Sequence, residues 1–116
     1  MSYIRYKNNN LFVESVSVRN LASKLNTPFY LYSEGNIIEN YKSFSNNFKK
    51  SKPLICFSVK ANSNIQILKV LKKMGSGADV VSGGELLKAI KSGIKPNKIV
   101  CSGVGKKEEE LKTSME

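Results

Sequence analysis

The chain has 116 residues, a hydrophobic fraction of 41% and a formal charge of +10. This composition is close to that of ordinary globular domains and excludes wholesale disorder. No stretch reaches the roughly 18 apolar residues of a membrane span, and the first residues contain no apolar run of signal-peptide length. We therefore expect a cytoplasmic protein with a buried core and no membrane partner.

The positive charge is compatible with a nucleic acid or another polyanion as partner. The lysines are scattered along the chain, however, and the only arginines are Arg5 and Arg19. Scattered lysines are typical of solvated helix faces, so we expect no nucleic-acid partner. A basic nucleic-acid-binding module stays open as an alternative, and salt-dependent binding to a polyanion would favour it.

The segment before Ser33 is the less regular part of the chain. Its pattern predicts a strand at residues 11–13, a short helix over 18–25 and a further strand candidate at 29–32. From Ser33 onward helix and strand alternate, with one unit about every 20 to 25 residues, as connected βα units require. The sequence thus predicts an α/β fold with a parallel sheet.

Apolar residues recur at helical spacing over 37–48 and predict an amphipathic helix there. Three predicted strands follow this helix at residues 54–59, 78–82 and 98–102. The first is almost continuously apolar, the form expected when both faces of a parallel sheet are covered. Between the strands, Asn64 is a predicted N-cap, and Gly75 and Gly93 are predicted helix terminators. The segment 106–116 begins with acidic residues suited to the amino end of a helix.

Lys60 directly follows the apolar run at 54–59 and precedes a polar turn. An amine at the carboxyl end of a strand lies where α/β barrels carry out chemistry, so Lys60 is a candidate Schiff-base lysine. The alternative is a solvated turn residue, which lysines at strand ends more often are.

Asp79 is an acid inside an apolar strand, between Ala78 and Val80. Burial of a carboxylate requires a partner or hydrogen bonds. That partner is either the backbone or a neighbouring lysine, or else Asp79 faces the mouth of the sheet near Lys60, where it orients a cofactor or the lysine itself. The residues alone favour neither interpretation.

The remaining polar residues carry weaker signals. Ser82, Ser102 and Asn62 follow the predicted strands, and Glu85 at the start of a helix is best explained as a capping residue. Cys56 and Cys101 are expected to be reduced core residues on non-adjacent strands. The chain has no histidine, so neither a typical zinc site nor a Ser/His/Asp system is expected, and we predict no metal.

Three phrases, taken together and in order, resemble the diaminopimelate decarboxylases, which are barrel-type pyridoxal-phosphate enzymes. They are ICFSVKANSN at 55–64, GADVVSGGE at 77–85 and KIVCSGVGK at 98–106. The similarity extends from about Asn26 to Leu111 and is highly specific. It implies a fold made of the first βα units of a TIM (β/α)8 barrel, spanning 33–116. Residues 1–32 would be a short segment of the family's β domain that leads into the barrel.

The resemblance also implies a reaction, decarboxylation of meso-2,6-diaminopimelate to L-lysine and carbon dioxide with pyridoxal 5'-phosphate as cofactor. Lys60 matches the lysine that bonds to the cofactor, and Asp79 matches an acid of the cofactor site. The family further implies a homodimer of the full-length enzyme.

The chain departs from this family in length, because a complete α/β barrel takes about 250 residues. We expect a truncated or split product that is inactive alone, with a complementing fragment as a possible partner. A vitamin B6-binding regulator of the same superfamily that does not decarboxylate stays open as an alternative.

Overall fold

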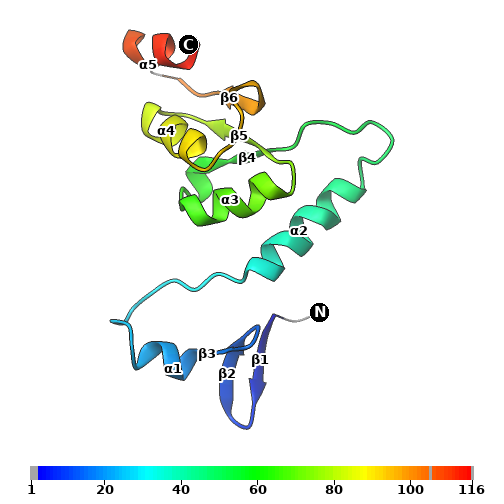
Figure 1. Ribbon diagram of the computed structural model, residues 1–116, viewed down its shortest axis with the longest axis vertical. Helices are drawn as coiled ribbons and strands as arrows, with labels where there is room; N and C mark the ends of the chain where they lie inside the picture. The colour runs from blue at the N-terminus through cyan, green and yellow to red at the C-terminus, as the bar shows by residue number, and fades with distance from the viewer. Residues whose placement is uncertain (1–2, 105, 116) are drawn as a thin grey trace.

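The computed structural model describes residues 3–104 and 106–115. Within them the chain forms two three-stranded sheets, ordered β1-β2-β3 and β4-β5-β6. Figure 1 shows the sheets at opposite ends of an elongated molecule, with α2 between them. The strands are β1 (Ile4–Lys7), β2 (Asn10–Val13), β3 (Val16–Ser17), β4 (Cys56–Ser58), β5 (Gly77–Val80) and β6 (Ile99–Cys101). The helices are α1 (Val18–Ala22), α2 (Glu34–Asn46), α3 (Ile65–Lys73), α4 (Gly83–Lys91) and α5 (Glu108–Met115).

The N-terminal sheet is antiparallel and begins with a tight hairpin. Asn8 and Asn9 join β1 to β2 with φ values of 49° and 57°, the left-handed conformation that two-residue hairpin turns favour. The strand predicted at 11–13 is confirmed, whereas β1 and β3 were not predicted. The helix predicted at 18–25 is present but ends at Ala22.

The strand candidate at 29–32 is wrong. These residues form an extended segment without a partner strand in the described part of the chain, and Tyr30 is 90% exposed. The ring of Tyr30 stacks on that of Tyr32, with centroids 6.3 Å apart. Aromatic and apolar composition favours a strand only where a neighbouring strand is available to pair with it.

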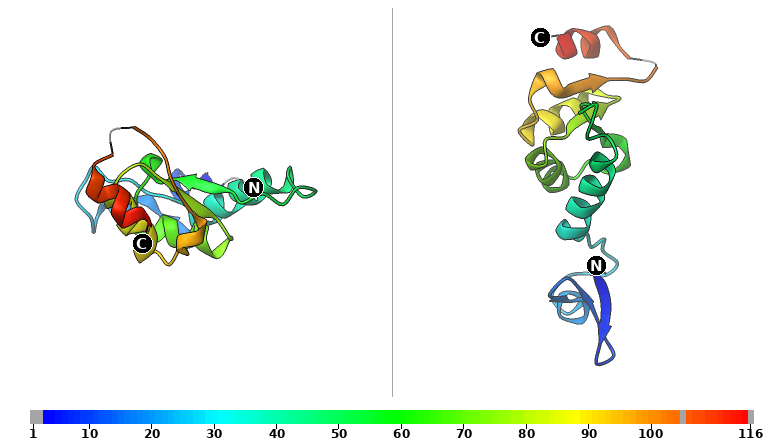
Figure 2. Two further views of the ribbon diagram at one scale, coloured as in Figure 1. Left: turned by 90° about the horizontal axis from the view of Figure 1, so that it is seen from above. Right: turned by 90° about the vertical axis from the view of Figure 1, so that its right-hand side faces the viewer.

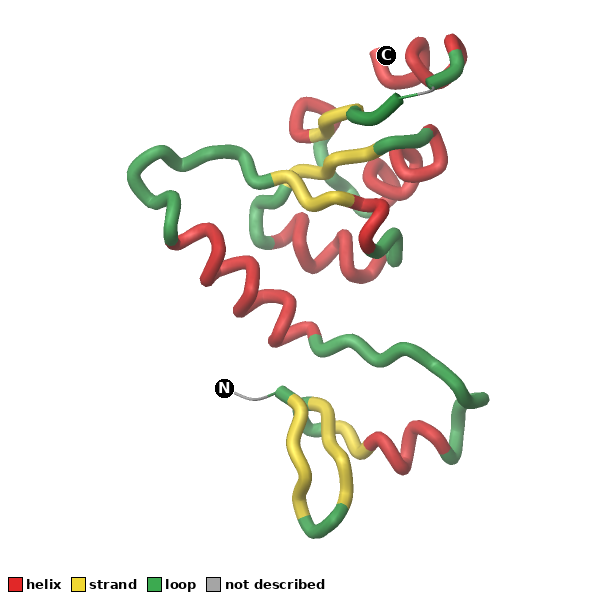
Figure 3. Tube along the Cα trace, turned by 180° about the vertical axis from the view of Figure 1, so that it is seen from behind, coloured by secondary structure: helices red, strands yellow, loops and turns green. Residues whose placement is uncertain are grey.

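The second sheet is parallel, as predicted, with β5 in the centre. Ser58 lies opposite Asp79 across β4 and β5, and Asp79 lies opposite Val100 across β5 and β6. The helix–strand alternation predicted from Ser33 onward is confirmed, although the strands are shorter than predicted. Figure 3 shows the three strands of this sheet side by side, far from the N-terminal hairpin.

One apolar core holds the parallel sheet to two helices. Its buried members are Val59, Leu68, Ala78, Val80, Leu86, Ala89 and Ile94, with Phe57 and Ile99 packed against them. Side chains alternate along a strand, so Ala78 and Val80 place one face of β5 against α3 and α4. Asp79 lies on the opposite face, which α3 and α4 do not cover.

The helix ends follow the predicted signals. The Asn64 side chain accepts a hydrogen bond from the Gln66 N–H at the start of α3, and Gly75 and Gly93 end α3 and α4 with φ values of 91° and 88°. Ser82 caps α4, and Glu85 accepts a hydrogen bond from the Val81 N–H at 2.9 Å, which confirms its capping role. None of the helices in the described ranges combines the length and apolar character needed to cross a bilayer.

The prediction that both cysteines lie in the core is wrong for Cys101. Cys56 is half-buried and Cys101 is exposed, and both are free thiols. Cys101 ends β6, an edge strand that leaves part of its surface uncovered, since Val100 is also 49% exposed. The expected separation of the two cysteines by a middle strand is confirmed by the strand order.

Candidate active site

Lys60 lies at the carboxyl end of β4, in the single 3₁₀ turn Val59–Ala61. The turn is anchored by Val59, which is completely buried in the core, while Lys60 itself is exposed. The sequence folds this way because an apolar residue and a cationic residue occupy consecutive positions at the end of a buried strand. The amine is therefore carried on a fixed backbone yet remains accessible to a ligand.

The loop after Lys60 is held by short-range hydrogen bonds. The Asn62 N–H donates to the Val59 carbonyl at 3.1 Å, and the Asn62 side chain accepts from the Asn64 N–H at 3.0 Å. The Lys88 ammonium of α4 donates to the Ser63 hydroxyl at 2.8 Å. These bonds fix the path of the chain between β4 and α3 and hence the base from which Lys60 projects.

Asp79 is a half-buried acid on the neighbouring strand, one residue before the end of β5. Its carboxylate accepts a hydrogen bond from the hydroxyl of Ser102, which follows β6. Among the described residues, neither the backbone nor a lysine, the two partners that the sequence suggested, donates a hydrogen bond to it. The structure thus gives Asp79 a side-chain partner that sequence reasoning did not connect with it, although Ser102 had been noted at a strand end.

The pKa of the Cys56 thiol is affected by the charge on this face of the sheet. The side chains of Cys56 and Ser58 project from β4 on the same side as Asp79, because paired residues in a parallel sheet share a face. Burial raises the pKa of the Cys56 thiol, and the negative charge of Asp79 raises that pKa further. The uncovered face of the sheet is therefore a region where the Asp79 carboxylate acts on its neighbours.

The carboxyl ends of the three parallel strands bring Lys60, Asp79 and Ser102 to one edge of the sheet. Open α/β sheets bind ligands outside this edge. Ser82 and Glu85 are engaged at the start of α4, and Asn62 is used within the Lys60 loop, so these three serve local structure. In the described residues no group of three or more histidine, cysteine or acidic side chains is arranged to hold a metal ion.

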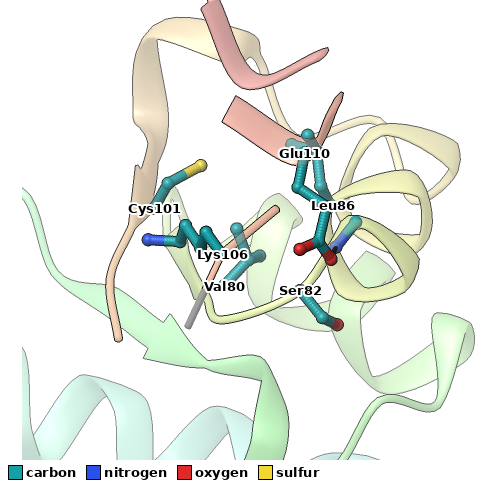
Figure 4. Close-up of a pocket in the computed structure, with 7 residues that line it drawn as sticks. Val80, Ser82, Leu86, Cys101, Lys106 and Glu110 are labelled. Carbon is teal, nitrogen blue, oxygen red and sulfur yellow. Dashed lines mark hydrogen bonds between the residues drawn. The ribbon is translucent and has the colours of Figure 1, made fainter. Parts of the chain in front are cut away.

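A small cavity lies beside the start of α4. Its lining includes Ser82, Cys101, Lys106 and Glu110, and its volume is about 10 Å³ (Figure 4). Glu110 reaches from α5 toward α4 and accepts a hydrogen bond from the Gly83 N–H at 3.2 Å. The volume is enough for about one water molecule, so this cavity is not a cofactor site.

A larger hollow of about 450 Å³ runs along the free edge of β4, between α2 and α3. Its lining is mostly apolar and includes Phe44, Phe57 and Leu71, with Ser58 and Asn62 at the end that adjoins Lys60. In the right-hand view of Figure 2, α2 leads from the N-terminal region up to the parallel sheet and its helices. The surface that the hollow exposes is mainly apolar and no cationic side chain of the described residues lines it, so the hollow offers little to a phosphate.

Comparison with known proteins places this geometry in a family. Residues 34–116 match the family model described as "Pyridoxal-dependent decarboxylase, pyridoxal binding domain". The chain is 47% identical to the diaminopimelate decarboxylase of Aquifex aeolicus over 109 residues, which cover 94% of this chain and 26% of that protein. The chain thus spans about a quarter of the length of this curated relative.

Solved structures agree with the sequence comparison. A crystal structure from Aquifex aeolicus superposes with a TM-score of 0.91 at 46% identity, covering 97% of this chain and 28% of the other. Diaminopimelate decarboxylase from Helicobacter pylori, solved in complex with L-lysine, gives a TM-score of 0.80 at 45% identity, covering 84% and 25%.

These matches confirm the predicted fold class, the first βα units of a barrel-type pyridoxal-phosphate decarboxylase. The roles of Lys60 and Asp79, and the division of the chain near residue 33, stay predictions. With the family model covering residues 34–116, the chain belongs to the pyridoxal-dependent decarboxylases, through their pyridoxal-binding domain.

Proposed function

We propose that this chain binds pyridoxal phosphate through Lys60 and is part of a decarboxylase that converts meso-2,6-diaminopimelate to L-lysine and carbon dioxide. The observation that carries the proposal is the exposed Lys60 amine at the carboxyl end of β4, one strand away from the half-buried Asp79. The named relative is a diaminopimelate decarboxylase, and the Helicobacter pylori structure holds L-lysine, the product of this reaction.

The residues present fit the proposed cofactor by their chemistry. Lys60 supplies a primary amine that reaches solvent, as bonding to an aldehyde carbon requires. Asp79 supplies a negative charge on the face that α3 and α4 leave uncovered, where it accepts hydrogen bonds from a cationic or protonated group. When bound, the cofactor supplies an electron sink for the pair left behind as carbon dioxide departs.

Lys60 then has two tasks. Its Nζ atom would hold the cofactor, and the same amine would be available as a proton acceptor and donor. It would do this without leaving the edge of the sheet, because Val59 holds the backbone of the turn in the core. Asp79 keeps its charge in place through the Ser102 hydroxyl.

The experiment that tests the cofactor assignment is reductive trapping. The 116-residue chain is mixed with pyridoxal phosphate, reduced with borohydride and digested, and the modified peptide is identified by mass spectrometry. We expect modification concentrated at Lys60 and abolished in Lys60→Ala. Lys69→Ala, which removes an exposed lysine of α3, is the matched control and should leave trapping unchanged. Equal labelling of many lysines would contradict the proposal.

The substrate assignment needs a separate measurement. We expect the 116-residue chain alone to release no carbon dioxide from diaminopimelate, because its three-stranded sheet leaves the Lys60 edge open to water. Addition of a polypeptide that supplies the strands of the longer relatives should restore release, and sedimentation would show whether the assembly is a homodimer. Trapping at Lys60 without release in that assembly would favour the vitamin B6-binding regulator, and salt-dependent polyanion binding without trapping would favour the nucleic-acid module.

A further inference from the structure

Asp79 occupies an unusual position for a carboxylate. Its neighbours along β5, Ala78 and Val80, are 0% and 1% exposed, whereas Asp79 is half-buried on the other face of the sheet. A carboxylate in such a place has several acceptor positions to satisfy and rotates about two side-chain bonds. Whether this carboxylate can bind a ligand in one defined geometry therefore depends on what fixes its side-chain orientation.

Ser102 is attached to β5 by two hydrogen bonds. Its backbone N–H donates to the Val80 carbonyl at 2.9 Å, which extends the pairing of β6 with β5 by one step. Its hydroxyl donates to the Asp79 Oδ1 atom. Since Asp79 pairs with Val100, Ser102 comes two residues further along the adjacent strand, and the backbone bond sets the hydroxyl beside the carboxylate.

The hydrogen bond from Ser102 leaves the Asp79 carboxylate able to accept further hydrogen bonds. One oxygen of Asp79 accepts the Ser102 hydroxyl, and a carboxylate has about four lone-pair positions, so the second oxygen retains its capacity for a ligand. Within the described residues Ser102 is the only side-chain hydrogen-bond donor to Asp79. Ser58, the register partner of Asp79 on the neighbouring strand β4, makes no hydrogen bond to it in the described part of the chain.

We propose that Ser102 is the positioning residue of the cofactor site, holding the Asp79 carboxylate in one orientation through its hydroxyl. This inference rests on the proposed function for its consequence, cofactor affinity, but its geometric part is independent of any ligand. Ser102 acts through Asp79 and is not itself assigned a contact with cofactor or substrate.

The test compares three variants of the full chain, Ser102→Ala, Ser102→Thr and Ser58→Ala. The first removes the hydroxyl, the second keeps it, and the third removes a hydroxyl from the other strand that flanks Asp79. Three-bond NMR couplings across the Asp79 Cα–Cβ bond report its side-chain rotamer without cofactor. Absorbance titration with pyridoxal phosphate reports affinity.

We expect Ser102→Ala to average the Asp79 couplings over several rotamers and to weaken pyridoxal phosphate binding by about 3- to 10-fold, the range of one ordinary hydrogen bond, because Ser102 acts on the cofactor only through Asp79. Ser102→Thr and Ser58→Ala should keep the parent couplings, and Ser102→Thr should keep the parent affinity. Unchanged couplings in Ser102→Ala would overturn the inference, as would averaged couplings with unchanged affinity. If the parent chain bound no pyridoxal phosphate, both the proposed function and the predicted change in affinity would be contradicted. The NMR couplings would still decide whether Ser102 orients the Asp79 side chain.

Discussion

The two ends of this molecule are held together by different forces. The hairpin region, residues 3–33, contains β1 to β3 and α1, and none of its side chains is fully buried. The βα region, residues 54–104, contains every member of the apolar core. The sheet that carries Lys60 is therefore stabilised by burial of apolar side chains, whereas the position of the hairpin depends on a few polar contacts.

Those polar contacts meet at the amino end of α2. Glu14, with a φ of 54°, accepts hydrogen bonds from the Ser33 hydroxyl at 2.6 Å and from the Gly35 N–H at 2.8 Å. Its own N–H donates to the Tyr3 carbonyl at 2.7 Å. We call these four residues the clasp. The radius of gyration of 17.2 Å exceeds the roughly 13 Å of a compact chain of this length, so the regions share little other surface.

The largest expected effect comes from the core of the βα region. Leu68 is completely buried, and Leu68→Ala should lower the free energy of unfolding by about 2 to 5 kcal/mol through lost burial and a residual cavity. Urea unfolding followed by circular dichroism measures the change. Leu87→Ala, at a 55% exposed position of α4, is the control and should change stability by no more than about 0.5 kcal/mol. Similar losses in both variants would mean that the core does not hold this region.

Alanine substitutions at two glycines, one in each region, test this difference in stability. A methyl group on Gly77 would meet the Lys98 carbonyl oxygen and lie 2.8 Å from the Cys56 sulfur, so Gly77→Ala should destabilise the chain by about 1 to 3 kcal/mol. A methyl group on Gly35 would meet the Tyr3 ring and lie 3.2 Å from the Glu14 Oε1 atom, both in the hairpin region, and would not touch the core of the βα region. Gly35→Ala should therefore leave the urea midpoint unchanged. An equal shift of the two midpoints would show that the clasp supports the whole fold.

The same contrast explains how much the sequence could predict. In the βα region each helix signal, such as Asn64 or Gly75, acts within a few residues, and the apolar runs fix the strands, so the order of elements followed directly. In the hairpin region the strand candidate at 29–32 failed because pairing depends on a distant partner. The Asn8–Asn9 pair could have predicted β1, since asparagine adopts the left-handed conformation of a two-residue hairpin turn more readily than most residues.

The candidate site was predictable as a set of residues but not as a set of contacts. Lys60 and Asp79 stood out because a charged group ended or interrupted an apolar strand. The bond between Ser102 and Asp79 joins residues 23 positions apart and depends on the parallel register of β5 and β6. No local pattern contains that register, and the same holds for Glu14 and Gly35 in the clasp.

The clasp itself gives a smaller, local prediction. Glu14→Gln removes the charge that Ser33 and Gly35 bind, so the Gly35 amide should exchange with deuterium severalfold faster, and protease cleavage within residues 23–33 should increase. The urea midpoint of the βα region should not move. Glu34→Gln, at the exposed first residue of α2, is the matched control and should leave both measurements near those of the parent chain. Slower cleavage, or equal effects of the two variants, would contradict a role for Glu14 in holding the hairpin.

The smallest effect is expected from pH, and its sign follows from the same bonds. The Ser33 hydroxyl, and then the Gly35 N–H, lower the pKa of Glu14 below its ordinary value, against a smaller opposing effect of burial. A lowered pKa in the folded state means that the clasp is stabilised above the ordinary carboxyl value of about 4.3 and is lost as pH falls through the depressed value. Tyr3 and Glu39 also lie at this contact; burial, and then the hydrogen bond to Glu39, raise the pKa of Tyr3, so Tyr3 does not ionise near neutral pH. The Gly35 amide shift, followed by NMR, should stay constant from neutral pH down to this acidic range and then change, with no such change in Glu14→Gln. A midpoint at or above the ordinary carboxyl value would mean that the clasp does not prefer the charged form, and the hairpin would then need another explanation for its position.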